Sequence, residues 1–442
     1  MRFAMFLYYL RLAKLSLSKQ PMLTALMIAA IGIGIGACMT VTAYLYVLSS
    51  DPIPEKSAHL YAVRLDSWGA DQPFSRDYPW EAPWQLTQRD SVALLESPIP
   101  VRQAAMRRAV YSAIPANDSV APFFVSARMT GRDFFDMFQV PFLYGGPWSV
   151  DADKSALNTV VLSHATNEKL FGGENSVGRE ARLGSESFVV AGVMDRWQPT
   201  ILFYDVNNGP MNDVEDVFLP WSIAGRKEID GAGNTNCFKD ELIETYWDML
   251  ESECVYNQFW AEIASSQDLE AYQVWLDTYT EGQKELGRFE RPTNNRLSTV
   301  TEYMEIRGVA GDEAWVIMCI GVLFLIACMV NTIGLILARF VAKSPIIALR
   351  RALGASKAQI FRQHLVEVGL VGFAGGILGL GLSYAGLAGL RMILEEAERA
   401  ARLRPELIAM TIAIAVLSAM LAGLYPTWRI CRVSPASFLK TQ

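Results

Sequence analysis

Four long stretches without a charged residue constrain what this chain can fold into. They are Met22–Leu48, Ala314–Ala338, Val368–Leu390 and Leu407–Trp428, of 27, 25, 23 and 22 residues. A helix needs about 20 apolar residues to cross the hydrocarbon core of a bilayer. Buried helices of soluble proteins rarely run so far without a charge, and the first stretch is too long for a signal peptide. We therefore expect transmembrane helices over residues 21–48, 313–341, 363–391 and 406–429.

Basic residues predict the orientation of these helices. Four Lys and Arg and no acid precede the first helix, six lie between Arg339 and Arg362, and three follow the fourth. Because Lys and Arg gather on the cytoplasmic side, both termini, the segment 342–362 and the tail 430–442 are expected in the cytoplasm. Residues 49–312 and a short loop over 392–405 are expected on the other side of the membrane.

The exported region reads as a large α+β domain between helices 1 and 2 of an α-helical membrane protein. It holds 40 Asp and Glu against 22 Lys and Arg, which argues against nucleic acid as a partner. Apolar alternation predicts strands at 59–65, 109–114, 123–130, 159–162, 187–193, 217–219 and 297–301, and helices near 84–95, 131–138 and 268–285. The run Gly145-Gly146-Pro147 breaks the chain and predicts a boundary between two subdomains.

The first 20 residues are basic and amphipathic. They favour a helix along the inner membrane face that bends into the first span at Pro21. A plain cytoplasmic extension of the first span is the alternative.

Of six cysteines, Cys237 and Cys254 are the two in the exported region. An oxidising compartment would allow them to form a disulfide. Two free thiols are the alternative to the disulfide that we expect.

Glycines recur at four-residue spacing within the spans. Gly32 and Gly36 lie in the first, and Gly372, Gly375, Gly376 and Gly379 in the third. Small residues at this spacing let helix backbones approach closely. We expect them to pack helices within or between subunits, with ordinary membrane-helix composition as the alternative.

Several functional motifs do not occur in the 442 residues. There is no G-x-x-x-x-G-K-[ST] phosphate-binding loop, no G-x-S-x-G elbow, and the three histidines have no partners at metal-ligand spacing. We therefore expect no catalytic, cofactor-binding or metal-binding residues in this chain. The lack of ionisable residues inside the charge-free stretches argues against a proton-coupled carrier.

The most specific signal spans the second and third helices. Arg350-Arg351-Ala352-Leu353-Gly354-Ala355 is followed by Gln359–Glu367 and by Gly375-Gly376, and the chain closes on Gly423–Arg429 and Val433–Ala436. This pattern resembles the FtsX-like permease domain of MacB-type exporters. Leu170-Phe171-Gly172-Gly173 with Ser176-Val177-Gly178 is similar to the periplasmic core domain of the same family. Together the two resemblances cover nearly the whole chain.

The resemblance implies the permease subunit of a type VII ABC transporter in a bacterial inner membrane. It implies a Porter-like subdomain over 51–145 and 226–312 and a Sabre-like one over 146–225. Residues Arg350, Arg351, Ala352, Leu353, Gly354 and Ala355 would form a short helix that docks on a separate cytoplasmic ATPase, which would bind ATP and Mg. One departure stands out: Ile346 occupies the position where the family usually has Glu.

The resemblance leaves several partners and functions open. A second permease copy or a different homologous permease would complete a dimer, alongside membrane lipid, a periplasmic adaptor and an outer-membrane channel. Export of small hydrophobic molecules or peptides from the periplasm is the first interpretation. An FtsX-like signalling permease that activates a periplasmic enzyme is the second, and lipoprotein extraction the third.

Overall fold

A computed structural model describes residues 2–76, 78–115, 121–393 and 405–431. The chain divides into two compact units. One comprises Met1–Ser50 with Ala310–Gln442, and the other is Asp51–Val309. Most of the loop expected over 392–405 and of the tail expected over 430–442 lies outside the described residues.

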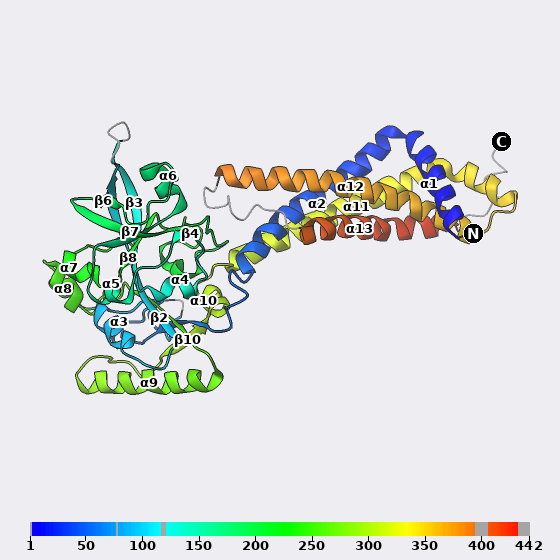
Figure 1. Cartoon of the computed structure of the whole chain (residues 1–442). Helices are drawn as coiled ribbons and strands as arrows, with labels where there is room; N and C mark the ends of the chain where they lie inside the picture. The colour runs from blue at the N-terminus through cyan, green and yellow to red at the C-terminus, as the bar shows by residue number, and fades with distance from the viewer. Residues whose placement is uncertain (1, 77, 116–120, 394–404, 432–442) are drawn as a thin grey trace. The chain divides into compact units, whose positions relative to one another are not determined.

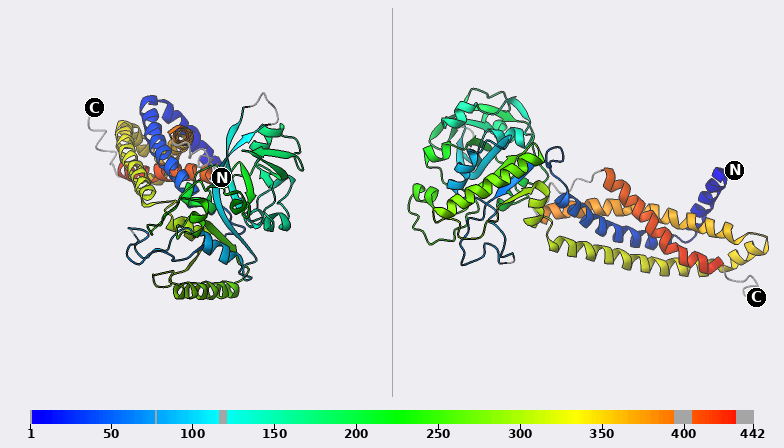
Figure 2. Two further views of the ribbon diagram at one scale, coloured as in Figure 1. Left: turned by 90° about the vertical axis from the view of Figure 1, so that its left-hand side faces the viewer. Right: turned by 90° about the horizontal axis from the view of Figure 1, so that it is seen from below.

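The first unit is built from long helices that run side by side (Figures 1 and 2). Its helices are α1 (Arg2–Ser18), α2 (Pro21–Ser49), α11 (Asp312–Ala352), α12 (Lys357–Ile393) and α13 (Pro405–Cys431). Four of them, all except α1, are long and apolar enough to span a membrane. Helices suit a bilayer because they satisfy every backbone hydrogen bond internally. The expectation of four spans is confirmed.

The N-terminal segment forms a helix of its own. α1 ends at Ser18 and α2 begins at Pro21, whose fixed φ suits the first position of a helix. α1 packs against α12, with Tyr9 and Ala13 buried. The chain therefore bends between α1 and α2, and α1 is not a straight extension of the first span.

The short helix expected between the second and third spans is absent from the described residues. α11 instead continues through Pro345 to Ala352, and α12 begins at Lys357. Pro345 does not end α11 because the helix packs on both sides of it: Phe340 and Ile347 are both buried in the apolar core of this unit. The segment 342–362 is thus the end of one helix, a turn and the start of the next.

The second unit is built on one ten-stranded mixed sheet. Its order is β10-β1-β9-β2-β3-β8-β5-β7-β4, with β6 paired to β2 and β7. The strands are β1 (Leu60–Arg64), β2 (Arg102–Ile114), β3 (Phe123–Thr130), β4 (Phe142–Gly145), β5 (Thr159–Leu162), β6 (Glu180–Leu183), β7 (Glu186–Met194), β8 (Val217–Pro220), β9 (Gln258–Glu262) and β10 (Arg296–Thr299).

Helices connect and cover these strands. They are α3 (Gln88–Leu95), α4 (Asp133–Met137), α5 (Val150–Lys154), α6 (His164–Phe171), the 3-10 helix η1 (Phe203–Asn208), α7 (Ile223–Lys227), α8 (Tyr246–Glu251), α9 (Ser266–Glu285) and α10 (Val300–Ile306). The mixture of strands and helices confirms the expected α+β class.

Two apolar cores lie along the sheet, and both take residues from β2. One gathers side chains of β2, β3, β5, β6, β7 and β8 with α6 and α7. The other gathers β1, β9 and the start of β2 under α3 and α9. β3 also pairs in parallel with β8, so the sheet continues across the boundary expected at Gly145. The two expected subdomains therefore share one sheet.

The last strand is shorter than its apolar pattern predicts. β10 ends at Thr299, whose hydroxyl accepts a hydrogen bond from the Glu302 backbone, while the Glu302 carboxylate accepts one from the Thr299 backbone. This capping box starts α10 at Val300. The strand expected over 297–301 is therefore wrong at its end, because the capping signal overrides the strand pattern.

A fully buried ionic network ties β3 to η1 and to the segment that precedes β8. Arg128 forms ion pairs with Asp205 and Glu215, and all three side chains are inaccessible to solvent. Tyr204 donates to Glu215 at 3.0 Å, and Gln258 donates to Asp205 at 2.7 Å. Burial raises the pKa of Asp205, which the adjacent Arg128 opposes.

Replacing Arg128 with Met should destabilise the exported unit by about 3–5 kcal/mol, because two buried carboxylates would lose their cation. The measurement is chemical unfolding of the full chain in detergent, followed by tryptophan fluorescence. Arg182→Met is the matched control, since Arg182 on β6 is exposed. It should change stability by no more than about 0.5 kcal/mol. Equal stability of the two variants would contradict the assigned role of Arg128.

Candidate functional site

The end of α11 presents an apolar stripe to its surroundings. Ile346, Leu349 and Leu353 are 56%, 55% and 80% exposed. Their spacing of three and four residues places them on one face of the helix. Arg350 and Arg351 flank this stripe, and Arg350 donates to Gln363 of α12 at 3.0 Å. The exposed face therefore combines apolar anchors with positive charge, a composition suited to docking.

A tight turn joins α11 to α12. Leu353 caps α11, and Gly354 has a φ of +98°, a conformation that L side chains rarely adopt. Ser356 then starts α12: its hydroxyl accepts from the Gln359 backbone at 3.2 Å, while Gln359 Oε1 accepts from the Ser356 backbone at 2.9 Å. The predicted residues Arg350–Ala355 thus form the last turn of α11 and this corner.

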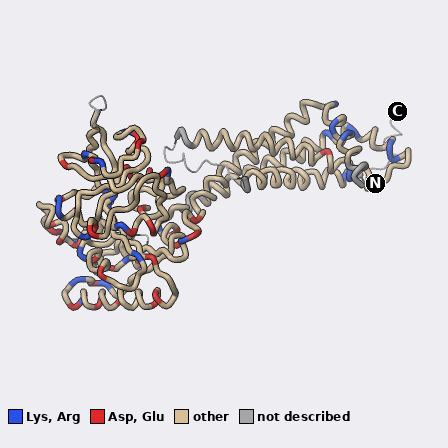
Figure 3. The backbone as a smooth tube through the Cα atoms, in the orientation of Figure 1, with Lys and Arg blue, Asp and Glu red and all other residues tan. Residues whose placement is uncertain are grey.

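A buried ionic cluster lies between α1, α11 and α12. Glu367 is 2% exposed, and its Oε1 lies 2.7 Å from Arg339 Nη2 and 2.9 Å from Lys343 Nζ. Ser16 of α1 donates to the same oxygen at 2.8 Å, and Arg339 donates to the Ser16 carbonyl at 2.9 Å. The cluster therefore fastens α1 to both long helices. Figure 3 shows that the charges of the helical unit gather at this end.

Sequence reasoning did not identify this cluster. Arg339 and Glu367 directly flank the charge-free stretches, where Arg339 indicates orientation and Glu367 belongs to the family motif. Their exposures of 2% each show that they are buried in the bundle. The available signal was the isolated acid, Glu367, after six basic residues, since a single carboxylate among cations predicts an ion pair. Leu349 was likewise missed, although its helical spacing from Ile346 and Leu353 is readable.

Helix α12 uses its glycines on two faces. A Cβ on Gly375 or Gly379 would come within 2.7 Å of Ile31 or 3.0 Å of Ile35 on α2. Conversely, Gly32 and Gly36 of α2 face Leu378 and Leu382 of α12. The six glycines predicted to pack helices therefore include four at the α2–α12 contact.

The other two glycines face α13. A Cβ on Gly372 would lie 2.5 Å from Ala419 Cβ and 3.0 Å from the Ala415 carbonyl, and one on Gly376 would lie 2.8 Å from Ala415 Cβ. In this structure all six glycines thus contact helices of the same chain.

The two exported cysteines are joined. Cys237 and Cys254 form a disulfide that closes a segment with a sequence separation of 17 residues. Cys254 is 1% exposed.

Comparison with known protein families gives two adjoining matches. Residues 24–278 match the MacB-like periplasmic core domain, and residues 318–435 match the FtsX-like permease C-terminal domain. The first match alone covers more than half of the chain. The chain is an ABC transporter permease of the MacB/FtsX-like family. The exported unit is accordingly the periplasmic domain of this family.

Two curated relatives carry the description "Macrolide export ATP-binding/permease protein MacB". The protein of Chromobacterium violaceum is 23% identical over 436 residues, which cover 97% of this chain and 60% of that protein. The protein of Rhodopirellula baltica is 23% identical over 313 residues, which cover 67% and 42%. The chain therefore spans about half the length of these relatives.

Solved structures with similarity include two bacterial extracytoplasmic domains. The periplasmic region of MacB from Actinobacillus actinomycetemcomitans has 13% identity and a TM-score of 0.37, covering 57% of this chain and 94% of that one. The extracellular domain of YknZ from Gram-positive bacteria has 10% identity and a TM-score of 0.34, covering 54% and 100%.

Replacing Gly372 with Leu should separate α12 from α13, because the new side chain would collide with the α13 backbone at Ala415. Overpacking of this kind costs about 1–3 kcal/mol. The measurement is the thermal stability of the purified permease in detergent. Gly381→Leu is the matched control: Gly381 lies on the same helix, and a Cβ there would have nothing within 4 Å. A Gly372 variant as stable as this control would show that α12 and α13 do not pack closely.

Proposed function

We propose that this chain is a non-catalytic permease subunit driven by a separate cytoplasmic ABC ATPase. ATP hydrolysis in the partner would move the ends of α11 and α12. This mechanotransmission would export small hydrophobic molecules or peptides from the periplasm. Macrolide export, the function in the names of the two curated relatives, supports an efflux role but names no cargo for this chain.

The observation that carries the proposal is the exposed stripe Ile346–Leu349–Leu353 beside Arg350 and Arg351. It occupies the corner at which we propose that the ATPase docks, as the family resemblance implies. Apolar anchors bordered by arginines are typical of interface centres. ATP and Mg would be bound by the partner, and a second permease, identical or homologous, would complete the transporter.

The buried cluster around Glu367 gives the corner a means to transmit force. Arg339 and Lys343 lie on the helix that carries the stripe, and Glu367 lies on the helix after the turn. Breaking a buried ion pair is costly, so α11, α12 and α1 are expected to move together when the corner is pushed. α2 and α11 connect directly in sequence to the periplasmic domain, which would receive this motion.

The proposed orientation places both termini in the cytoplasm of the inner membrane. A cysteine introduced at exposed Lys357 should react with a membrane-impermeant thiol reagent only after spheroplasts are opened. One at exposed Glu270 should react in intact spheroplasts. The parent chain for this test carries Cys319→Ser and Cys431→Ser, because Cys319 is exposed and Cys431 lies in the tail expected in the cytoplasm. Labelling of residue 357 in intact spheroplasts would reverse the orientation.

Replacing Leu353 with Asp should weaken ATPase binding by about 30-fold or more, because an unpaired carboxylate would be buried at the interface. The measurement is co-purification of the ATPase and its turnover rate. Leu286→Asp is the matched control, since Leu286 is 75% exposed in the periplasmic domain. It should leave both readouts unchanged.

A second variant tests the turn itself. Gly354→Val should also impair coupling, because valine is strained at a φ of +98° even though a Cβ there would have nothing within 4 Å. Ile346→Glu should be tolerated where the ATPase carries a matching basic residue, since the family usually has Glu at this position. Full ATPase occupancy and turnover with Leu353→Asp would show that the corner does not dock.

A further inference from the structure

The periplasmic domain holds an open cavity of about 510 Å³ beside β2. Arg107 and Arg108 of β2 and Asn208 at the end of η1 line it. The remaining walls come from Glu228–Thr235, from Ile243–Met249 and from Tyr256. This volume lies within the usual range for small-molecule sites, about 300–1,000 Å³.

Arg107 lies at the cavity as a buried cation without an acidic partner. Its side chain is 3% exposed, yet among the described residues no carboxylate lies within 4 Å of its guanidinium. Nη2 donates to the Ile229 carbonyl and, at 3.3 Å, to the Tyr246 hydroxyl. The guanidinium lies 5.6 Å from the ring centres of both Tyr246 and Tyr256. Buried charges are ordinarily paired, so this one is suited to an anionic group of a ligand.

Arg108, the neighbouring arginine, differs from Arg107 because it has an acidic partner. Arg108 Nε lies 3.7 Å from Glu215, which also pairs with buried Arg128. Arg108 is therefore already neutralised by the network beneath the cavity, whereas Arg107 is not.

The same network fixes the cavity floor. Asn208 donates to both Asp205 oxygens, at 2.7 and 2.9 Å. The Asn208 side-chain oxygen accepts from the Asn234 backbone at 2.6 Å. The floor is thus preorganised by buried contacts, which lowers the ordering cost of binding.

The mouth of the cavity carries the opposite charge. Glu228, Asp230 and Glu244 line it and are exposed. Burial raises the pKa of Tyr246, and it raises that of Tyr256 to about 12, so both phenols stay neutral at physiological pH. The site therefore offers a cation inside, neutral aromatic walls and carboxylates outside.

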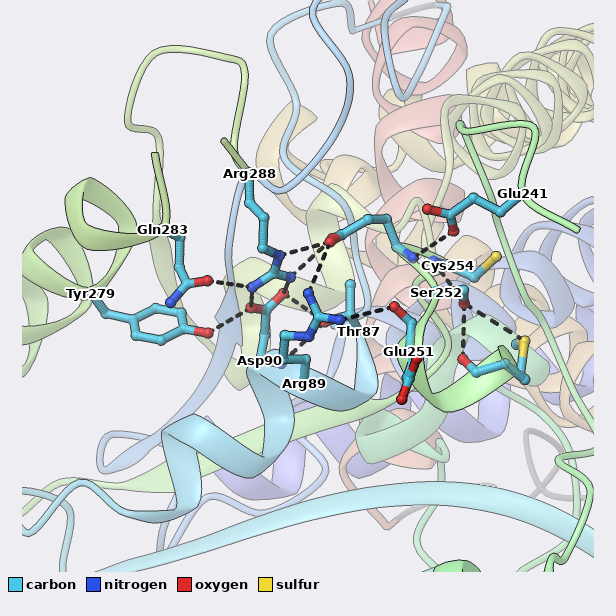
Figure 4. A network of polar contacts seen from close by, with 12 residues as sticks. Thr87, Arg89, Asp90, Glu241, Glu251, Ser252, Cys254, Tyr279, Gln283 and Arg288 are labelled. Carbon is cyan, nitrogen blue, oxygen red and sulfur yellow. Dashed lines mark hydrogen bonds and ion pairs between the residues drawn. The ribbon is translucent and has the colours of Figure 1, made fainter. Parts of the chain in front are cut away.

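The disulfide closes one wall of this cavity. Residues Ile243–Met249 lie within the segment that Cys237 and Cys254 join. The Cys254 end is anchored beside Glu253, which pairs with Arg288 at 2.7 Å, and Arg288 also pairs with Asp90 of α3 at 2.9 Å. Figure 4 shows the guanidinium group of Arg288 between Asp90 and the segment that carries Cys254. The disulfide thus holds the wall that carries Tyr246 and Glu244 to a fixed point of the domain.

We propose that this cavity binds a zwitterionic molecule of the size of a short peptide. Its carboxylate would contact Arg107, its ammonium group would face Glu228, Asp230 and Glu244, and its apolar part would lie against Tyr246, Tyr256 and Met249. Binding requires the disulfide, because reduction releases the wall. The inference concerns the periplasmic domain alone and holds whether or not the ATPase docks at Leu353.

The test uses the full chain in detergent and the zwitterionic tetrapeptide Ala-Phe-Ala-Phe, with binding measured by calorimetry. Two derivatives separate the charges: C-terminal amidation removes the carboxylate, and N-terminal acetylation removes the terminal ammonium. Amidation should weaken binding by at least about 10-fold, because it removes a charge-assisted contact with Arg107. Acetylation should weaken it less, because the mouth is exposed to solvent and salt screens it.

Substitutions of the acids at the cavity mouth test whether the peptide binds in this cavity. Glu244→Gln with Asp230→Asn should reduce affinity for the free peptide but not for its acetylated form, and both positions are exposed, so folding should be retained. Glu270→Gln, an exposed acid on α9 that does not line the cavity, is the matched control. Reduction of the disulfide should abolish binding while the unfolding transition of the helical unit persists.

Two outcomes would overturn the proposal. One is equal affinity for the free and amidated peptides, which would exclude Arg107 as the carboxylate partner. The other is absence of calorimetric binding by the oxidised, folded chain at millimolar peptide. Loss of ATPase coupling in the Leu353 variant bears on the proposed function and leaves these measurements unaffected.

Discussion

Close approach of α12 to two neighbours is the contact on which the membrane unit depends. Lipid provides little hydrophobic driving force for helix association, so close packing must hold the helices together. α12 presents Gly375 and Gly379 to α2 and Gly372 and Gly376 to α13, and larger side chains at these positions would collide with the partner helices. The same helix carries Glu367 five residues before Gly372, where the bundle contains its buried charges. A single helix therefore sets both the spacing of the bundle and the position of its ionic cluster.

Each unit buries a small group of charged side chains in which one charge is shared by two opposite charges. In the bundle, Glu367 is shared by Arg339 and Lys343. In the periplasmic domain, Arg128 is shared by Asp205 and Glu215. Such groups contribute little net stability, but removing one member leaves the others uncompensated. They specify one arrangement of the elements they join, which suits the transmission of motion that we propose.

The sequence predicts well what depends on local pattern. Charge-free length defines the four spans, and alternation defines β3 and β5 to the residue. The sequence does not predict what depends on long-range pairing. β9 lies between β1 and β2 because Gln258–Glu262 pairs with both strands, which are distant from it in the sequence. Within the candidate site, the corner Arg350–Ala355 is readable from its motif. The cluster of Ser16, Arg339, Lys343 and Glu367 is not, because its members are up to 351 positions apart and meet only in the packed bundle.

Ile346, where the family usually has Glu, lies on α11, which continues as one helix to Ala352. An acid at this position would be exposed on the same face as Leu349 and Leu353, beside Arg350. It could then bind a basic residue of an ATPase by a charge-assisted contact. Isoleucine instead extends the apolar stripe by one turn, since residues at spacings of three and seven share a helix face. A permease with this face would dock by burial of apolar area, which is insensitive to salt. A homologous permease with the acid would dock partly by charge. If two different permeases share one ATPase dimer, the two docking faces would differ in kind, and the motion delivered to the two halves need not be equal.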